Sequence, residues 1–306
     1  MSIAGQIWNE RVVALGHGGS LVGVYCEPRG ETRRNVCAIF LNSGLVHHVG
    51  PNRLYVRLAR EFASIGVSSI RFDLSGVGDS GTAAADADTI LEQVQQDVAA
   101  AIDHAFSNGA TGVVLLGICS GADNSFVTAV RDERVVGIVL IDPNMYRTTT
   151  FYLHHIRKRI LRGRTWLNLV SGPHSIPNRL AALRKQASAA AESTPAVSVF
   201  LAPTRLPPIE EMRQQLSTLI ERDTRMLYIF SGGLEWRYNH RRQLFHAFPG
   251  LDWKGRMQLE YYAAADHTFS RVDHQRILIQ TIREWLLSSS FREVIVPAET
   301  EEILFY

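Results

Sequence analysis

The chain has 306 residues, 46% of them hydrophobic and 20% charged, with a formal net charge of +2. This composition is ordinary for a globular protein, and the small net charge gives no reason to expect nucleic acid as a partner. No segment approaches the roughly 18 uninterrupted apolar residues of a membrane span, and the N-terminal stretch MSIAGQIWNERVV lacks the apolar core of a signal peptide.

Three cysteines, Cys26, Cys37 and Cys119, are an odd number and lie far apart in the sequence. That spacing fits neither a disulfide framework nor a zinc site, so we expect free thiols in a reducing cytoplasm. The chain carries no metal-ligand spacing, and we expect neither a metal nor a cofactor.

The first third of the chain alternates between strand and helix patterns. Residues 11–28 contain two β-branched runs on either side of a glycine pair, which predicts a hairpin. VCAIFLNSG (36–44) is a nearly continuous apolar run, typical of a strand buried on both faces. Residues 51–66 carry apolar residues at helical spacing and end at a glycine, and VSSIRFDLSG (67–76) predicts the next strand.

The same alternation continues to the end of the chain. An amphipathic helix is predicted over 89–109, followed by a strand at GVVLLGICS (112–120) and then another helix. The remaining strands and the last helix are predicted, in order, at 135–143, MLYIFSGG (226–233), LEYYAAADH (259–267) and 275–289.

Strands that alternate with helices build a doubly wound, mostly parallel sheet, and its ligands lie beyond the carboxyl ends of the strands. The interval 144–224 breaks the alternation. It contains three predicted helices, at 148–170, 176–193 and 207–223. A structureless loop of that length is uncommon inside a domain, so we predict an inserted helical lid. The core then comprises 1–143 and 225–290, and 291–306 form a tail that packs as an edge strand or contacts another subunit.

The pentapeptide GICSG (117–121) joins a predicted strand to the helix after it. In an elbow of the pattern G-x-nucleophile-x-G, the central side chain sits on a sharp turn above the sheet. The central residue here is Cys119, and a helix N-terminus stabilises its thiolate form. Ser120 then contributes a backbone N–H to an oxyanion hole. Taken alone, the pentapeptide equally fits a small buried residue in a tight turn.

The other groups that such a nucleophile needs follow from the order of the strands. The loop after LNSG offers the second oxyanion donor, the N–H of Leu45, with Gly44 permitting the turn. His267, in AADHTF after the last strand, is the predicted base, and the alternative is a capping or core histidine. The predicted acid is Glu235, the first carboxylate after MLYIFSGG, and its rival is Asp142 in LIDPN.

These residues resemble the α/β-hydrolase superfamily. NSGLVHHVGPNRLYVRLAREF, RFDLSGVGDSG, GICSGA and DHTF occur in this order, as in a subgroup with a cysteine elbow. That subgroup includes exosortase-system-associated hydrolases and thioesterase- or acyltransferase-like hydrolases of natural-product pathways. The resemblance covers most of 36–146 and the core near 226–290, and it implies the α/β-hydrolase fold without specifying a substrate. FSGGLEW departs from the pattern, since it carries no obvious strand-end Asp. Arg53 in GPNR is expected to tie the oxyanion loop to Asp73 or Asp79.

The predicted reaction is acyl transfer through a thioester on Cys119, with His267 as the base. A thioester acyl-enzyme is close in energy to a thioester donor and reacts readily with amines. The expected partner is therefore a small acyl substrate, delivered by coenzyme A or by an acyl or peptidyl carrier protein. The acceptor is water, an amine or an alcohol. The alternatives are a lactone or ester hydrolase with a Cys–His–acid triad, and a non-catalytic binding protein with an inert elbow.

The predicted lid contains the basic stretch HHIRKRILRGR (154–164). Its cations are Arg157, Lys158, Arg159, Arg162 and Arg164. The stretch is either a solvated helix face or a contact for an anionic partner, such as a carrier protein, a phosphopantetheine arm or a lipid head group at a membrane. Tyr152 and Trp166 offer an apolar wall for an acyl chain, and His47 is a further candidate for lining the pocket.

Overall fold

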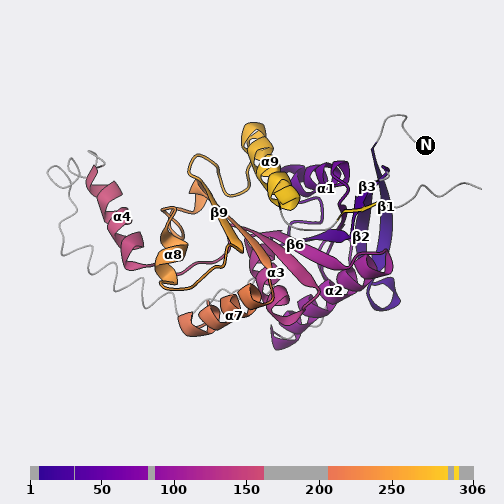
Figure 1. The fold of residues 1–306 in the computed structure, drawn as a ribbon, viewed down its shortest axis with the longest axis horizontal. Helices are drawn as coiled ribbons and strands as arrows, with labels where there is room; N and C mark the ends of the chain where they lie inside the picture. Colours follow the sequence, from indigo (N-terminus) through magenta and orange to yellow (C-terminus); the bar gives the residue numbers. More distant parts are fainter. Residues whose placement is uncertain (1–6, 31, 82–86, 162–205, 289–292, 296–306) are drawn as a thin grey trace, which may run out of the picture.

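A computed structural model describes residues 7–30, 32–81, 87–161, 206–288 and 293–295. Its centre is an eight-stranded sheet in the order β1-β2-β5-β4-β6-β7-β8-β9 (Figure 1). These strands are β1 (Trp8–Leu15), β2 (Leu21–Pro28), β4 (Val36–Leu41), β5 (Ser68–Phe72), β6 (Gly112–Ile118), β7 (Val135–Ile141), β8 (Arg225–Ser231) and β9 (Met257–Tyr262). β1 and β2 form an antiparallel hairpin, and β2 is also antiparallel to β5. The six strands from β5 to β9 in the sheet order are all parallel to one another, so the predicted mostly parallel sheet is confirmed.

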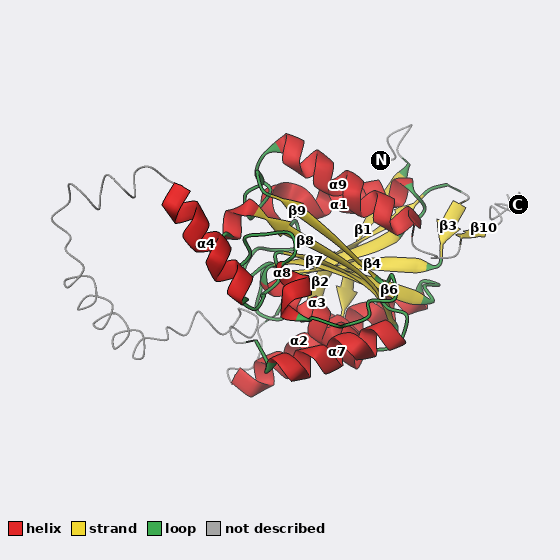
Figure 2. Ribbon diagram, turned by 60° about the vertical axis from the view of Figure 1, so that its left-hand side comes forward, coloured by secondary structure: helices red, strands yellow, loops and turns green. Residues whose placement is uncertain are grey.

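Helices cover both faces of the sheet, as Figure 2 shows. On one face lie α1 (Leu54–Ser64) and α9 (Val272–Ser288). On the other lie α2 (Ala87–Ser107), α3 (Ser120–Arg131) and α7 (Ile209–Glu221). Every side chain of β4 and β6 is buried, because these central strands are covered on both sides. The nearly continuous apolar runs in the sequence therefore have a direct structural cause.

Short elements complete the description. They are η1 (His17–Gly19), β3 (Thr32–Arg34), η2 (Pro51–Arg53), α4 (Thr149–Leu161), η4 (Gly232–Leu234), α8 (Gln243–Ala247) and β10 (Glu293–Ile295). Of the tail, the structure describes β10, which pairs with β3 in a separate two-stranded sheet and not with the main one. None of the described helices is long and apolar enough to cross a bilayer.

The interval 144–224 is only partly described, and its two described helices differ in position. α4 lies beside α8 at one end of the molecule (Figure 1). α7 instead packs on α3, and its Leu216, Leu219 and Ile220 join the core. Its predicted helix exists, but it belongs to the core layer and not to a lid. The predicted helix 176–193 and the second half of 148–170 lie outside the described residues.

Tyr55 connects two neighbouring strands at the edge of the sheet where ligands are expected. Its hydroxyl donates to the carbonyl of Leu41 at the end of β4 (2.9 Å) and accepts from the N–H of Ile118 at the end of β6 (3.3 Å). The ring is fully buried. Both backbone groups lack water as an alternative partner, so the hydroxyl completes the hydrogen bonding of this edge.

We expect Tyr55→Phe to lower the free energy of unfolding by about 1–3 kcal/mol, because it removes a buried hydroxyl that bonds to the backbone of two strands. Urea denaturation followed by fluorescence measures the change. Tyr152→Phe is the matched control, because Tyr152 is 52% exposed. The free energy of unfolding of this variant should stay within about 0.5 kcal/mol of the parent protein. Equal stability of the two variants would contradict the assigned role of Tyr55.

Candidate active site

Cys119 occupies the turn between β6 and α3. Its backbone angles are φ 57° and ψ −119°, which lie in a region that residues other than glycine rarely adopt. The α3 helix begins at the next residue, Ser120. A nucleophile elbow has this geometry: the side chain stands on a strained turn between a strand and a helix. Cys119 is partly exposed, whereas Cys26 and Cys37 are buried.

Gly121 allows α3 to approach the end of the neighbouring strand. A Cβ atom at this position would lie 2.7 Å from the carbonyl oxygens of both Leu41 and Asn42, far inside van der Waals contact. The backbone N–H of Cys119 also donates to the carbonyl of Ile141 on β7 (2.9 Å). The elbow is therefore fixed against the strands on both sides of β6.

His267 lies in the loop between β9 and α9. Asp266 holds that loop by accepting hydrogen bonds from the backbone N–H and hydroxyl groups of Thr268 and Ser270. Gly233 packs against the same loop, where a Cβ atom would overlap the backbone nitrogen of His267. The glycines of FSGG thus allow the segment after β8 to approach the histidine loop.

Asp142 is the carboxylate that contacts His267. Its Oδ2 lies 2.8 Å from Nδ1 of the imidazole. The carboxylate is buried and also accepts from the N–H (2.7 Å) and the hydroxyl (2.6 Å) of Ser231. Asp142 itself has a positive φ of 50°, which turns the chain at the end of β7. Four polar groups therefore orient one another at the ends of β7 and β8.

The prediction of Glu235 as the acid is wrong, and its rival Asp142 takes the position beside His267. Glu235 is exposed and forms an ion pair with Lys158 of α4 (2.8 Å). The end of β8, where we expected the acid, carries Ser231, whose N–H and hydroxyl donate to the carboxylate that β7 supplies. The strand order alone does not distinguish these two arrangements.

The charges of this triad stabilise one another. Hydrogen bonding to Asp142, followed by hydrogen bonding to Cys119, raises the pKa of His267 to about 9. Hydrogen bonding to His267 is the largest influence on Cys119 and lowers the pKa of its thiol, with a further contribution from the guanidinium of Arg237. The arrangement therefore stabilises the thiolate of Cys119 together with the imidazolium of His267. Burial has the opposite effect on Cys26 and Cys37, whose pKa values it raises to about 12.

The oxyanion loop, residues 42–50, is attached to the elbow. The N–H of Gly44 donates to the hydroxyl of Ser120 (2.7 Å), so this hydroxyl positions the loop instead of capping α3. The next residue, Leu45, is exposed, and its N–H donates no hydrogen bond within the described part of the chain. The N–H of Ser120 faces the Cys119 sulfur. The hydrogen bond between Gly44 and Ser120 thus joins the two segments that carry the predicted oxyanion donors, the N–H groups of Leu45 and Ser120.

Asp73 holds the other side of the oxyanion loop. Its buried carboxylate accepts from the backbone N–H of His48 (2.6 Å), the ring of His48 (2.8 Å), the amide of Asn42 (2.9 Å) and the N–H of Asp79 (3.2 Å). Burial raises the pKa of this carboxyl, but the hydrogen bonds from His48 and Asn42 outweigh it and lower the pKa. The prediction that Arg53 ties the loop to Asp73 or Asp79 is wrong, because Arg53 is exposed.

His48, Asp73 and Asp79 bring three possible metal-ligating atoms within 4.8 Å of one another. However, the oxygens of Asp73 already accept four hydrogen bonds from the protein, two of them from His48. The cluster therefore has a structural explanation, as the attachment of two loops.

The remaining predicted residues are more scattered. His47 is exposed at the tip of the oxyanion loop, and Tyr152 is exposed on α4, so neither lines an enclosed pocket. Arg157 is exposed on the same helix, Lys158 pairs with Glu235, and Arg159 lies in the last turn of α4. Trp166, Arg162 and Arg164 lie outside the described residues.

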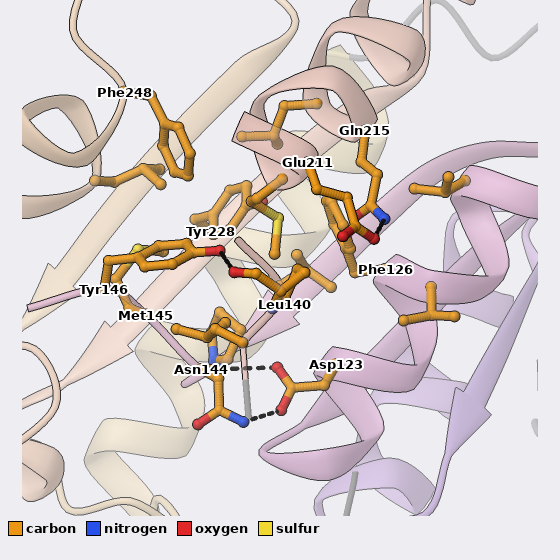
Figure 3. A pocket seen from close by; sticks show the side chains of 18 of the residues that line it. Asp123, Phe126, Leu140, Asn144, Met145, Tyr146, Glu211, Gln215, Tyr228 and Phe248 are labelled. Atoms are coloured by element: carbon orange, nitrogen blue, oxygen red, sulfur yellow. Dashed lines mark hydrogen bonds between the residues drawn. The ribbon is translucent and has the colours of Figure 1, made fainter. Parts of the chain in front are cut away.

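A cavity of about 250 Å³ opens between α3, α7 and the segment that leads from β7 to α4 (Figure 3). Most of its wall is apolar and includes Phe126, Leu140, Met145, Tyr228 and Phe248. The triad side chains are not part of the wall, but the cavity begins one helical turn beyond Cys119.

Asp123 is the carboxylate at that end of the cavity. It accepts from the N–H (2.9 Å) and the side-chain amide (2.6 Å) of Asn144, as the dashed lines in Figure 3 show. Burial raises the pKa of Asp123 to about 6. Neither Asp123 nor Arg237 is indicated by the sequence patterns, because the partners of both come from distant segments.

The protein-family model described as serine aminopeptidase, S33, matches residues 34–233. No curated protein matches the chain significantly. Among solved structures, a serine α/β hydrolase without a lid from Xanthomonas campestris is 15% identical, with 93% of this chain and 98% of that chain covered and a TM-score of 0.51.

Two further structures are similar. Est1E from Butyrivibrio proteoclasticus is 14% identical, with 90% and 97% of the two chains covered and a TM-score of 0.53. A candidate dienelactone hydrolase from Klebsiella pneumoniae is 11% identical, with 92% and 99% covered and a TM-score of 0.55. At these identities the structural likeness shows the fold, which is that of α/β hydrolases.

We expect iodoacetamide to alkylate Cys119 rapidly at pH values well below 9, the ordinary pKa of a thiol, because the protonated His267 stabilises the thiolate. Asp142→Asn removes the anion that keeps the proton on His267, so the alkylation profile should move to higher pH. Intact-protein mass spectrometry of a pH series measures both profiles.

The matched control for Asp142→Asn is Glu235→Gln, which should leave the profile in place because Glu235 pairs with Lys158 and not with His267. Cys26 and Cys37 serve as internal controls and should stay unlabelled in the folded protein. A shift in Glu235→Gln, or none in Asp142→Asn, would reverse the assignment of the acid.

We expect Asp73→Ala to lower the free energy of unfolding by roughly 2–4 kcal/mol, because four donors of the oxyanion loop and its neighbour lose a buried charged acceptor. Urea denaturation measures the loss. Asp79→Ala is the matched control, since Asp79 is exposed and only its backbone N–H takes part. Similar losses in both variants would show that Asp73 does not organise the loops.

Proposed function

The chain belongs to the serine aminopeptidase S33 family of α/β hydrolases, and on that premise we propose that it is an acyl-transfer enzyme with Cys119 as its nucleophile. The observation that carries this proposal is the sequence of contacts from Asp142 through His267 to a cysteine on a strained elbow. The central position of the elbow holds a thiol, and the neighbouring Ser120 uses its hydroxyl to hold the oxyanion loop.

In the first step, the Cys119 thiolate attacks the carbonyl carbon of an acyl donor. The carbonyl oxygen becomes an oxyanion, which the N–H groups of Leu45 and Ser120 stabilise; such a donor contributes about 3 kcal/mol in enzymes where one was removed. The bond from the carbon to the leaving group then breaks, and His267 gives its proton to that group. The products are an acyl-Cys119 thioester and the free leaving group.

In the second step, His267 acts as the base. The neutral imidazole takes a proton from the acceptor as the acceptor attacks the thioester carbonyl. The tetrahedral intermediate collapses and expels the Cys119 thiolate, while the imidazolium that remains pairs with it again. Asp142 stays ionised throughout, because its role is to orient Nδ1 and to stabilise the positive ring.

A thiol nucleophile favours an activated donor. Transfer of the acyl group from a thioester substrate to Cys119 forms another thioester, so the two states have similar free energies. Neither the substrate nor the acyl-enzyme therefore accumulates because of its stability. We therefore propose a small acyl thioester as the donor, delivered by coenzyme A or by an acyl or peptidyl carrier protein. The acceptor is water in a thioesterase and an amine or alcohol in an acyltransferase.

The cavity beside α3 is the proposed location of the apolar part of the substrate. Its volume of about 250 Å³ exceeds that of an engineered cavity of roughly 150 Å³ that binds benzene. The wall residues Phe126, Leu140 and Tyr228 suit an apolar group.

The exposed cations of α4 support delivery by an anionic partner. Arg157 is exposed, and the ion pair of Lys158 with Glu235 joins two half-exposed side chains, which contributes little to stability and is easily exchanged. We propose that an acidic carrier protein docks on this helix, which then serves as part of a lid.

We expect brief exposure to the N-acetylcysteamine thioesters of short acids to add one acyl mass to the wild-type protein, with the adduct mapped to Cys119. Cys119→Ala should abolish the adduct, and Cys26→Ala, which changes a buried thiol, should retain it. Intact-protein mass spectrometry followed by peptide mapping makes the measurement. Loss of the adduct on addition of amines, alcohols or buffer alone identifies the acceptor.

Absence of adduct and turnover, together with resistance of Cys119 to iodoacetamide, would contradict catalysis and leave a binding protein. An adduct on Ser120 in Cys119→Ala would contradict the assignment of the nucleophile. Rapid turnover of lactones or oxygen esters, with no turnover of thioesters, would favour the lactone or ester hydrolase instead.

A further inference from the structure

Arg237 lies beside the active site in the segment between β8 and α8. Its backbone is fixed on both sides: its N–H donates to the carbonyl of Leu234 (2.8 Å), and its carbonyl accepts from the side-chain amide of Gln243 (2.9 Å). The guanidinium lies over the indole ring of Trp236, 4.8 Å from the ring centroid. The backbone of Arg237 is thus fixed, and its guanidinium rests on the neighbouring indole ring.

The guanidinium of Arg237 lacks an anionic partner. Its Nη1 atom is buried and has no hydrogen bond. No described residue forms an ion pair with it, although its charge acts on two groups, the thiol of Cys119 and the carboxyl of Asp123. Asp123 does not pair with it, since both of its oxygens accept from Asn144. A buried cationic N–H without an acceptor is costly, which indicates that a ligand supplies one.

A second guanidinium is placed nearby. Arg147 lies over the same indole ring of Trp236, at 5.9 Å, and over the ring of Phe151, at 5.8 Å. Arg147 is exposed and forms no ion pair with the described residues. The indole of Trp236 thus contacts two guanidinium groups, neither of which forms an ion pair with a described residue.

We propose that Arg237 binds a carboxylate carried by the acyl group of the substrate. This inference rests on the proposed function and names the class of donor: an acyl thioester whose acyl chain bears a second, ionised carboxyl group. A guanidinium fork matches the two oxygens of a carboxylate. The remainder of the chain then spans from Arg237 to the Cys119 sulfur.

The position of Arg237 favours a carboxylate over a phosphate. Arg237 follows Gly233, whose backbone packs against the His267 loop, so the proposed anion lies on the segment that borders the reacting groups. The phosphate groups of coenzyme A or of a phosphopantetheine arm are separated from the thioester by the whole length of the pantetheine chain. A carboxylate within the acyl group needs only a few bonds to reach both sites.

The test compares matched N-acetylcysteamine thioesters. In the first set, one carboxyl group of a dicarboxylic acid from malonate to adipate is the thioester and the other is free. In the second set, the free carboxyl group is replaced by a neutral amide and the thioester is kept. We expect the wild type to prefer the acid over the amide of at least one chain length by about 10- to 100-fold in kcat/KM, as for a hydrogen-bonded charge. Arg237→Gln should abolish that preference, and Arg237→Lys should restore part of it.

The ratio between acid and amide separates substrate binding from the effect of Arg237 on the thiol, since a changed thiolate fraction alters both substrates equally. Arg241→Gln is the matched control, because Arg241 lies four residues along the chain, is 67% exposed and pairs with Glu260. It should keep the preference of the wild type. Acylation by the neutral amides also shows in every variant that the site is folded.

Equal use of acids and amides by the wild type, with Cys119 acylated by both, would overturn the carboxylate site and leave the proposed function intact. A second comparison uses coenzyme A and N-acetylcysteamine thioesters of the same neutral acyl group. If Arg237→Gln lowers kcat/KM for the coenzyme A thioester only, the bound anion is a phosphate and the proposal is wrong. A separate arm needs no turnover: free dicarboxylates should protect Cys119 from iodoacetamide in the wild type and not in Arg237→Gln. Absence of that protection would overturn the site even if no thioester reacts.

Discussion

The close crossing of α3 over the ends of β4 and β6 is the constraint on which the active site depends. Gly121 brings the first turn of the helix against the carbonyls of β4, and no larger residue fits there. Beside this contact, the turn at Cys119 has an unfavourable backbone conformation, and the N–H of Cys119 is bonded to β7. The N–H of Ser120, the first residue of α3, faces the sulfur.

Two buried carboxylates attach the loops that surround this elbow. Asp73 collects the donors of the oxyanion loop, and Asp142 collects Ser231 and His267. In both cases a charged acceptor at the end of a strand satisfies backbone N–H groups that would otherwise be buried without a partner. The loops gain a defined position from single side chains, although they contain little regular structure.

Much of this arrangement could be predicted from local patterns. The strands follow from apolar runs, the elbow from the spacing in GICSG, and the location of His267 from its position after the last strand. A family resemblance to α/β hydrolases agreed with these predictions. The α7 helix shows the limit of periodicity, because an amphipathic helix has the same pattern whether it packs on a sheet or covers an active site.

The remaining errors concern contacts between distant segments. Glu235 and Asp142 are equally good acids by type, and only the backbone turn at Asp142 and the hydroxyl of Ser231 decide between them. Arg53 was expected to hold the oxyanion loop, a role that His48 and Asn42 fill. Arg237 carries no motif at all, because its environment exists only after β6, β7 and the segment beyond β8 have come together.

The proposed acid, Asp142, follows β7, so it lies outside the segment that follows Ser231. The three proposed catalytic residues, Cys119, Asp142 and His267, follow β6, β7 and β9, and none of them lies in residues 232–248. The exposed side chains of that segment, such as Trp236, can therefore change to accept a new molecule. Any recombination of residues 232–248 between relatives has to keep Gly233, because its backbone packs against the His267 loop.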